Sequence, residues 1–201
     1  MTPWRVALTF DLEHADRPHA PGNTDRLLDA LDRAVVPATL FLQGRWVEAR
    51  PVTAARIGTS RHLVGNHSHY HTRFSLLSDA GVATDLSDAG TAIRDIVGVD
   101  PAPWFRFPFG AGADDPRVLA LVATAGYRPI GWDVDGLDWE VDRTATDLEL
   151  AVVDGAIRHG DGVIVLCHGW PDPTHQALPG IVARLRDAGA AFVRMDALLA
   201  G

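Results

Sequence analysis

The feature that most constrains this chain is a repeated alternation between short β-rich runs and amphipathic helical stretches. Apolar, β-branched and aromatic residues gather in seven runs, which we expect to form strands at residues 5–11, 38–43, 62–66, 104–107, 128–134, 163–167 and 191–194. Helical periodicity or helix-capping residues lie between most of these runs, at residues 25–34, 85–97, 115–126, 148–158 and 178–188. This alternation predicts an α/β fold, with parallel strands inside and helices outside.

Seven parallel strands suit either an open doubly wound sheet or an incomplete (β/α) barrel. In both architectures the active groups lie at the carboxyl ends of the strands. The 201 residues contain no linker, low-complexity tract or second domain that we can distinguish, so we expect a single domain over residues 1–201.

Composition excludes several classes of function. The net charge of −8, without a basic run or patch, argues against a nucleic-acid partner. No stretch approaches the roughly 20 apolar residues of a membrane span. Because the first expected strand begins near Trp4, there is no room for a signal peptide, and we expect a cytoplasmic protein.

The reactive residue types narrow the chemistry further. The single cysteine, Cys167, excludes an internal disulfide and any site built from several thiolates. The sequence has no lysine, which excludes Schiff-base chemistry, a lysine-anchored pyridoxal phosphate and the lysine of a P-loop. The motifs "HExxH" and "GxSxG" are also absent, so neither a zinc metalloprotease helix nor a serine-hydrolase turn is indicated.

Acids, histidines and an arginine follow the expected strands at one end of the fold. The five clusters are "DLEH" from Asp11, "GNHSHYH" with His67, His69 and His71, "FRFPFG" with Arg106, "WDVDGLDW", and "LCHGW" with His168. Because the carboxyl ends of parallel strands meet at one edge of the sheet, we expect these clusters to converge on one site.

The histidine cluster indicates a metal site. His67 and His71 are four residues apart, so one helical turn would place both imidazoles on the same face. Zinc prefers such nitrogen ligands together with a carboxylate, and leaves one position open for water. His69 would point elsewhere, with an outer-shell or substrate contact as the hypothesis. We expect the other histidines to be surface or structural residues: His14, His19, His62, His159 and His175.

Together these motifs resemble the polysaccharide deacetylase family, also called the NodB-homology domain or carbohydrate esterase family four. "TFD", "NHSxxH", "RxPFG", "DxxDW" and "LxH" occur here in the family's order, and the likeness runs from Val6 to Leu199. The resemblance implies a distorted (β/α) barrel with about seven parallel strands. It also implies removal of acyl groups, usually N-acetyl from amino sugars, with one divalent metal ion, for which zinc comes first and cobalt, nickel and manganese follow.

The resemblance also assigns roles to individual residues. Asp11 matches the catalytic base and Arg106 the arginine that pairs with it, while His67 and His71 match two metal ligands. The remaining matches are His168 as general acid, Asp138 as the acid that orients it, Phe109 as the backbone donor to the oxyanion, and Trp139 and Leu166 as the pocket for the acyl methyl group.

One position departs from the family pattern. The family usually has "TFDDG", and its second aspartate is the third metal ligand, but Leu12 stands there in this chain. Some relatives of the family have an acid one residue later, and Glu13 holds that position. Residues i and i+2 of a strand point the same way, so we predict that Glu13 faces the site beside Asp11 and completes the metal ligands, while Leu12 faces the wall.

The substrate stays open at the level of the sequence. Candidates are an N-acetylated amino sugar, a short chitin-type oligosaccharide or a sugar on a biosynthetic intermediate. Hydrolysis of another carbon–nitrogen bond, as in a cyclic amide such as allantoin, is an alternative implied by relatives with altered first motifs. A carbohydrate-binding protein without turnover is a third, although binding alone requires neither a base nor an acid.

Overall fold

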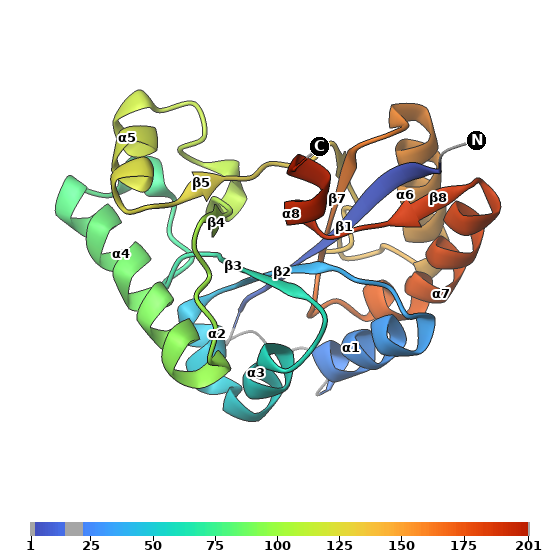
Figure 1. The fold of residues 1–201 in the computed structure, drawn as a ribbon, viewed down its shortest axis with the longest axis horizontal. Coiled ribbons are helices and arrows are strands. Elements are labelled where there is room, and N and C mark those ends of the chain that lie inside the picture. Colours follow the sequence, from blue (N-terminus) through green and yellow to red (C-terminus); the bar gives the residue numbers. More distant parts are fainter. Residues whose placement is uncertain (1–2, 15–21, 201) are drawn as a thin grey trace.

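The computed structural model describes residues 3–14 and 22–200, and its centre is a parallel sheet that curls into part of a barrel (Figure 1). The strand order is β5-β4-β3-β2-β1-β7-β6, with β8 paired to β1, and every pairing is parallel. The strands are β1 (Trp4–Leu12), β2 (Thr39–Leu42), β3 (Leu63–Asn66), β4 (Trp104–Phe105), β5 (Arg128–Pro129), β6 (Val134–Asp135), β7 (Val163–His168) and β8 (Ala190–Phe192).

The sheet path has two ends that do not meet. Among the described strands, β5 pairs with β4 and β6 pairs with β7, but β5 and β6 do not pair with each other. The barrel is therefore open between them. The predicted α/β fold, a distorted (β/α) barrel with about seven parallel strands, is confirmed, with seven strands in the path and β8 beside β1.

Helices surround the sheet. They are α1 (Asn23–Ala34), α2 (Gly44–Ala49), α3 (Pro51–Gly58), α4 (Asp79–Ala92), α5 (Pro116–Thr124), α6 (Ala145–His159), α7 (Asp172–Asp187) and α8 (Met195–Leu199). Two short 3-10 helices, η1 (Phe74–Leu76) and η3 (Pro108–Gly110), and a π-helix that continues α4, η2 (Ile93–Val97), complete the set. No helix of residues 3–14 and 22–200 combines the length and apolar character needed to cross a membrane.

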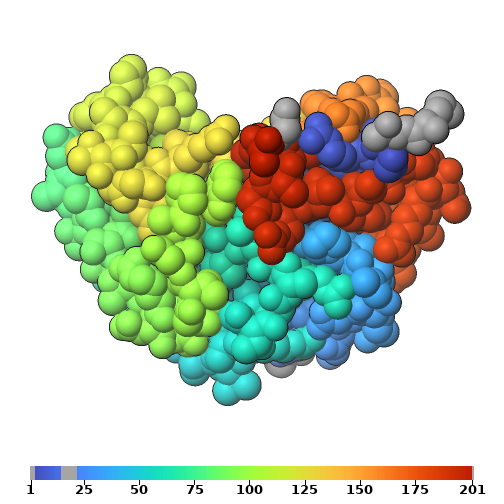
Figure 2. Space-filling view, viewed as in Figure 1, coloured from blue at the N-terminus to red at the C-terminus, as the bar shows by residue number. Residues whose placement is uncertain are grey.

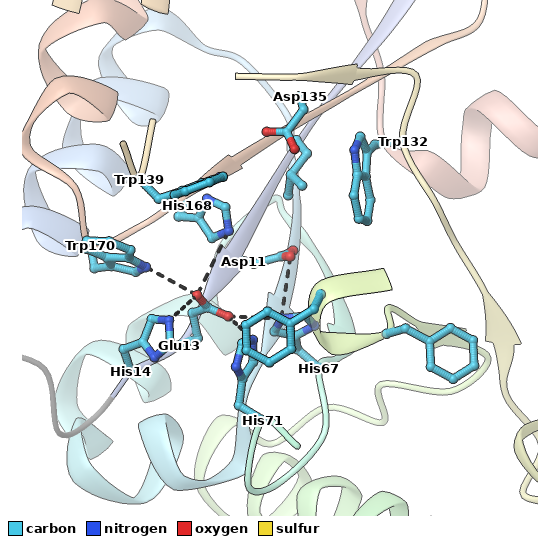
Figure 3. A pocket seen from close by; sticks show the side chains of 13 residues that line it. Asp11, Glu13, His14, His67, His71, Trp132, Asp135, Trp139, His168 and Trp170 are labelled. Atoms are coloured by element: carbon cyan, nitrogen blue, oxygen red, sulfur yellow. Dashed lines mark hydrogen bonds and ion pairs between the residues drawn. The ribbon is translucent and has the colours of Figure 1, made fainter. Parts of the chain in front are cut away.

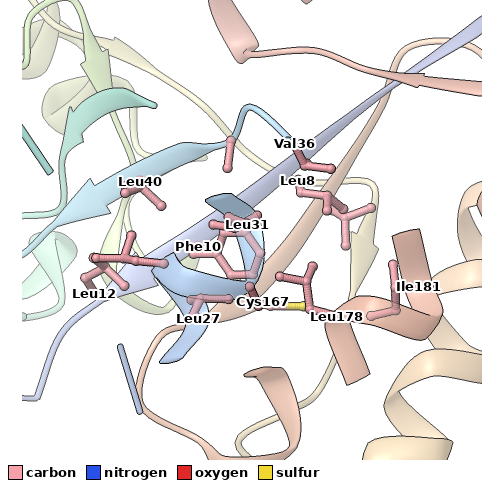
Figure 4. Packing of buried hydrophobic residues seen from close by; sticks show 14 of the residues in the cluster. Leu8, Phe10, Leu12, Leu27, Leu31, Val36, Leu40, Cys167, Leu178 and Ile181 are labelled. Carbon is pink, nitrogen blue, oxygen red and sulfur yellow. The ribbon is translucent and has the colours of Figure 1, made fainter. Parts of the chain in front are cut away.

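The main core lies between β1 and the helices α1 and α7. Leu8, Phe10 and Leu12 alternate along β1 and pack against Leu27 of α1 and Leu178 of α7 (Figure 4). Each of these side chains is at most 3% exposed, and burying one contributes roughly 1.5–3 kcal/mol. The intervening residues of β1 face the other side of the sheet, because side chains alternate along a strand.

Helix α8 closes the inner side of the half-barrel. Met195 and Leu198 are buried against Ala7 of β1, Phe41 of β2 and Ile130, which follows β5. In Figure 2, α8 is the red element at the centre of the face, beside the yellow segment around β5. Apolar residues around α8 thus fill the barrel interior, whereas the polar side chains lie at the carboxyl ends of the strands.

Several element boundaries differ from the sequence predictions. The expected strand at residues 128–134 is two short strands, because β5 pairs with β4 and β6 pairs with β7, and residues 130–133 cross the barrel opening between them. The expected strand at residues 104–107 keeps only two residues. The helix predicted at residues 178–188 begins earlier, at Asp172, and the one at residues 85–97 begins at Asp79. Helices α2 and α3 were not predicted, because six and eight residues are too few for a clear helical period.

Candidate active site

Side chains from the carboxyl ends of the strands line a pocket of about 410 Å³ (Figure 3). All five clusters contribute to it, so the expected convergence of the strand ends is observed. The lining comprises Asp11, Glu13, His14, His67, His71, Phe107, Phe109, Trp132, Asp135, Trp139, Leu166, His168 and Trp170.

Strand β1 decides where the acids of the first cluster lie. Asp11 and Glu13 are each 3% exposed and lie on the pocket side, whereas Leu12 packs into the core. An added Cβ on Gly169 would come within 2.1 Å of Leu12 Cδ2, so Leu12 fills the space that this glycine leaves beyond β7. Leu12 therefore cannot reach the pocket, and Glu13 lies beside Asp11 as predicted.

His67 and His71 reach the same point through a tight turn. The helical turn that their spacing predicts is wrong, because residues 67–71 contain no helix and Ser68 and His71 have left-handed backbones, with φ of 66° and 57°. The Asp85 carboxylate accepts from the backbone N–H of His69 at 2.7 Å and of the next residue at 3.1 Å. The Ser68 hydroxyl accepts from the His71 N–H at 2.9 Å. These side chains replace the backbone partners that a helix would supply.

Glu13, His67 and His71 bring three electron-pair donors together, all within 4.8 Å of one another. His67 Nδ1 lies 3.0 Å from the carbonyl oxygen of Arg106 and must donate to it. In the neutral ring Nε2 then presents a lone pair to Glu13 Oε2, 3.1 Å away, and His71 Nε2 also contacts this oxygen. A positive charge is needed between these facing atoms, carried either by a proton on an imidazole or by a metal ion. Two imidazoles and a carboxylate are a donor set used by catalytic zinc, so these residues fit a divalent metal ion.

Burial and the charges of neighbouring side chains shift the pKa values of these three groups. Burial raises the pKa of the Glu13 carboxyl, but hydrogen bonds from His14, His67 and His71 outweigh it and hold the pKa well below its usual range. Burial lowers the pKa of His67, while the Asp11 and Glu13 charges raise it, and the net direction is upward. Burial dominates at His71, whose pKa is lowered. The two carboxylates thus favour a positive charge at this point.

Arg106 holds Asp11 in place. The arginine is fully buried, and its Nη1 donates to Asp11 Oδ1 at 3.0 Å and to Thr9 Oγ1 at 2.7 Å. Its Nη2 and Nε donate to the carbonyl oxygens of Gly131 and Ile130 at 3.0 and 3.3 Å. The expected pairing of Arg106 with Asp11 is therefore present, and the other bonds leave the guanidinium little freedom to turn.

His168 is held by Asp138 from behind. Its Nδ1 lies 2.7 Å from Asp138 Oδ1, and its backbone N–H donates to Oδ2 at 2.6 Å. The Thr174 hydroxyl also donates to Oδ2, at 2.5 Å. Burial lowers the pKa of His168, but the Asp138 charge and hydrogen bond raise it to about 10. The imidazole is therefore protonated at neutral pH, and its Nε2 atom lies 3.9 Å from Glu13 Oε1 in the pocket.

Apolar and aromatic side chains surround these polar groups. Leu166 is buried in the pocket wall, whereas Trp139 and Phe109 are 49% and 54% exposed. Phe109 has φ of 57°, and its ring lies edge-on to His71 with 4.5 Å between centroids. Trp132 also lines the pocket, although no sequence motif predicted a role for it. Its signal in the sequence is its place at the start of the cluster "WDVDGLDW".

Two more histidines of the described residues lie near this site, His14 in the pocket and His69 behind it. His14, expected at the surface or in a structural position, lines the pocket and its Nε2 lies 2.7 Å from Glu13 Oε1. Its place directly after Glu13 was the signal that could have found it. His69 is buried behind the turn against Gly44, where an added Cβ would come within 2.3 Å of its Nδ1, and it does not line the pocket. The prediction for His19 falls outside the described residues.

The chain is similar to several known proteins. The family model for polysaccharide deacetylase matches residues 2–130. A chitooligosaccharide deacetylase of Sinorhizobium fredii is 32% identical over 196 residues, which cover 92% of this chain and 86% of that protein. Other relatives are longer, and this chain spans 52% of the Bacillus subtilis protein YlxY, with 28% identity over 175 residues.

Solved structures have the same fold. The T48 deacetylase, determined with substrate, matches with a TM-score of 0.84 and 33% identity, over 99% of this chain and 92% of that one. BA3943 of Bacillus anthracis, described as a pseudoenzyme of carbohydrate esterase family 4, matches with a TM-score of 0.86 and 26% identity, over 98% of this chain and 66% of that one. A mutant of BA3943 has restored enzymatic activity.

Proposed function

The chain belongs to the polysaccharide deacetylase family, and from this premise we propose that it is a metal-dependent hydrolase of N-acyl groups. The acyl group is acetyl in the first instance, carried by an amino sugar or a related small N-acylated compound. The observation that carries the proposal is the pocket in which Glu13, His67 and His71 meet beside Asp11 and His168. The deacetylases among the relatives support this chemistry.

Glu13, His67 and His71 would hold the metal ion. A divalent ion in such a site supplies Lewis acidity, which polarises a carbonyl group and makes water a better nucleophile. Zinc is our first candidate, because it favours imidazole nitrogens together with a carboxylate oxygen, and cobalt, nickel and manganese follow.

Asp11 would accept the proton of the attacking water. Arg106 Nη1 holds Oδ1 of this carboxylate, while Oδ2 lies 3.5 Å from His67 Nε2 and is turned to the candidate metal site. Arg106 thus orients the base without contacting the substrate itself.

His168 would return a proton to the leaving nitrogen. Strands β1 and β7 are in register at Asp11 and His168, so the base and the acid come from adjacent strand positions. Asp138 accepts at Nδ1, which directs the opposite Nε2–H into the pocket. An imidazolium is suited to protonate an amine as the carbon–nitrogen bond breaks.

The pocket walls would bind the rest of the scissile group. The backbone N–H of Phe109 is the candidate donor to the tetrahedral oxyanion, and Leu166 with Trp139 offers an apolar space for the acyl methyl group. Trp132 and Trp139 add aromatic faces against which the apolar side of a sugar ring can pack. An oligosaccharide or a single amino sugar is therefore the partner we propose.

A substrate panel tests this function. Purified protein loaded with Zn²⁺ is incubated with N-acetylglucosamine, chitooligosaccharides, acetylated xylan and allantoin, and the release of acetate or of the ring-opened product is measured. We expect acetate release, abolished by a chelator and restored by added metal. The Asp11→Asn and His168→Ala variants should each lose roughly 100-fold or more in kcat. If allantoin is opened and no acetate is released from the sugars, the proposed deacetylase function is wrong and cyclic-amide hydrolysis takes its place.

A carbohydrate-binding pseudoenzyme is the second candidate. Leu12 at a family metal-ligand position and the likeness to BA3943 favour it. Against it stand Glu13 in the pocket and the intact Asp11–Arg106 and His168–Asp138 pairs, which carbohydrate binding alone does not require. Binding of chitooligosaccharides without any metal-dependent acetate release would favour the pseudoenzyme.

A further inference from the structure

The two carboxylate oxygens of Glu13 face different partners (Figure 3). Oε2 lies against the Nε2 atoms of His67 and His71, at the candidate metal site. Oε1 instead accepts hydrogen bonds from His14 Nε2 at 2.7 Å and from Trp170 Nε1 at 3.3 Å. One oxygen is therefore directed to the metal site, and the other is held from the opposite side.

The backbone of His14 has the conformation that this contact requires. Its φ of 61° is left-handed, which is uncommon outside glycine and turns the chain sharply at the end of β1. The His14 N–H donates to Gln43 Oε1 at 3.0 Å, and the Gln43 N–H donates to the Leu12 carbonyl oxygen at 3.0 Å. The imidazole ring thereby turns back over Glu13 and lies edge-on to Trp170, with 5.5 Å between centroids.

A glutamate needs such support more than an aspartate does. Its side chain has one more rotatable bond, and fixing that bond costs conformational entropy. Oε1 also has a competing partner, because His168 Nε2 lies only 3.9 Å away. Without His14 and Trp170, the carboxylate could rotate from the metal site toward His168.

We propose that His14 and Trp170 are positioning residues that hold Oε1 of Glu13, so that Oε2 stays directed at the metal ion. This inference rests on the proposed metal site. Four successive residues then have different roles: Asp11 is the base, Leu12 packs into the core, Glu13 is a metal ligand and His14 positions that ligand. Outer-shell partners of this kind typically change metal affinity by about 10–100-fold when they are removed.

The test measures the Zn²⁺ dissociation constant by competition with a chromogenic chelator. His14→Phe keeps a ring and removes the N–H donor, and should weaken Zn²⁺ binding by roughly 10–100-fold. His14→Gln restores an N–H donor on the same backbone and should recover most of the affinity. Trp170→Phe removes the longer of the two hydrogen bonds and should have a smaller effect of the same sign.

Matched controls come from elsewhere in the fold. His159 lies 3.5 Å from Asp133, and the Trp4 indole donates to the Ala188 carbonyl oxygen at 2.9 Å, both outside the pocket. His159→Phe and Trp4→Phe should leave Zn²⁺ affinity unchanged. The melting temperature of each metal-free variant separates a loss of fold from a loss of ligand orientation.

A double-mutant cycle on Zn²⁺ affinity distinguishes a positioning role of His14 from a merely structural one. In a Glu13→Ala background, adding His14→Phe should weaken Zn²⁺ binding no further, because the oxygen that His14 holds is gone. Equal losses in both backgrounds, or unchanged affinity in His14→Phe alone, would overturn the inference and leave the proposed function standing. Wild-type protein that binds none of Zn²⁺, Co²⁺, Ni²⁺ or Mn²⁺ would overturn both.

Discussion

Replacement of Arg106 by methionine tests the pair that holds the catalytic base. Arg106 is fully buried and donates to Asp11, to Thr9 and to the carbonyl oxygens of Gly131 and Ile130. Methionine fills part of the same volume and removes all of these donors. The variant therefore leaves a buried carboxylate without its cation and leaves two carbonyl groups without a donor.

The expected cost follows from these contacts. Removing one partner of a buried ion pair costs about 3–5 kcal/mol, because an uncompensated charge stays inside. A typical domain is stable by about 5–15 kcal/mol, so Arg106→Met should fold but lose a large part of its free energy of unfolding. Urea denaturation of the metal-free protein measures this loss without a contribution from bound metal.

The double variant Asp11→Asn/Arg106→Met provides the decisive comparison. Removing the charge of Asp11 relieves the penalty, so the double variant should be more stable than Arg106→Met by about 2 kcal/mol. A loss below about 1 kcal/mol in Arg106→Met would refute the reasoning. So would a double variant whose loss equals the sum of the single losses, because the two residues would then act independently.

Three further predictions concern other parts of the chain. Asp138→Asn removes the charge that raises the pKa of His168 to about 10, so the acid loses its proton earlier and the alkaline limb of the pH–rate profile should fall by roughly 1–3 pH units; an unmoved limb would exclude His168 as the acid. Leu12→Ala should lower the free energy of unfolding by about 2–5 kcal/mol, measured by urea denaturation, and leave Zn²⁺ affinity nearly unchanged. A loss of Zn²⁺ affinity as large as that of Glu13→Ala would contradict the placement of Leu12 in the core. Burial lowers the pKa of His62 from 6.5 to about 4. The folded state therefore disfavours protonation of His62. The stability that depends on a neutral His62 is fully present above pH 6.5 and is lost as the pH falls through about 4. The stability lost over that range should be on the order of 2 kcal/mol, and His62→Gln should flatten the dependence; equal slopes in both proteins would contradict it.

The sequence by itself determined the strand–helix order and the face on which the first acids lie. Successive side chains of a strand point to opposite sides, so the apolar Phe10 and Leu12 place Asp11 and Glu13 together on the other face. This relation needs only the local geometry of one extended segment. The meeting of the strand ends followed from the alternation of strands and helices, because this alternation implies parallel strands whose carboxyl ends lie at one edge.

Boundaries set by neighbouring elements could not be obtained in this way. The break at residues 130–133 exists because β5 pairs with β4 while β6 pairs with β7, and both partners are distant in sequence. Helices α2 and α3 are held by buried residues such as Trp46 and Ile57, which contact segments from other parts of the chain. Short elements of this kind depend on tertiary packing more than on their own periodicity.

The tertiary structure alone decided how the histidines act. The spacing of His67 and His71 correctly brought the two rings together, but through a helical turn that does not exist. Their convergence depends on left-handed backbones at Ser68 and His71, fixed by the Asp85 carboxylate from α4. Likewise, no local pattern could tell that Gln43 would turn His14 back onto Glu13. A side-chain direction set by a partner many residues away is a property of the folded chain, because the sequence near the residue does not contain that partner.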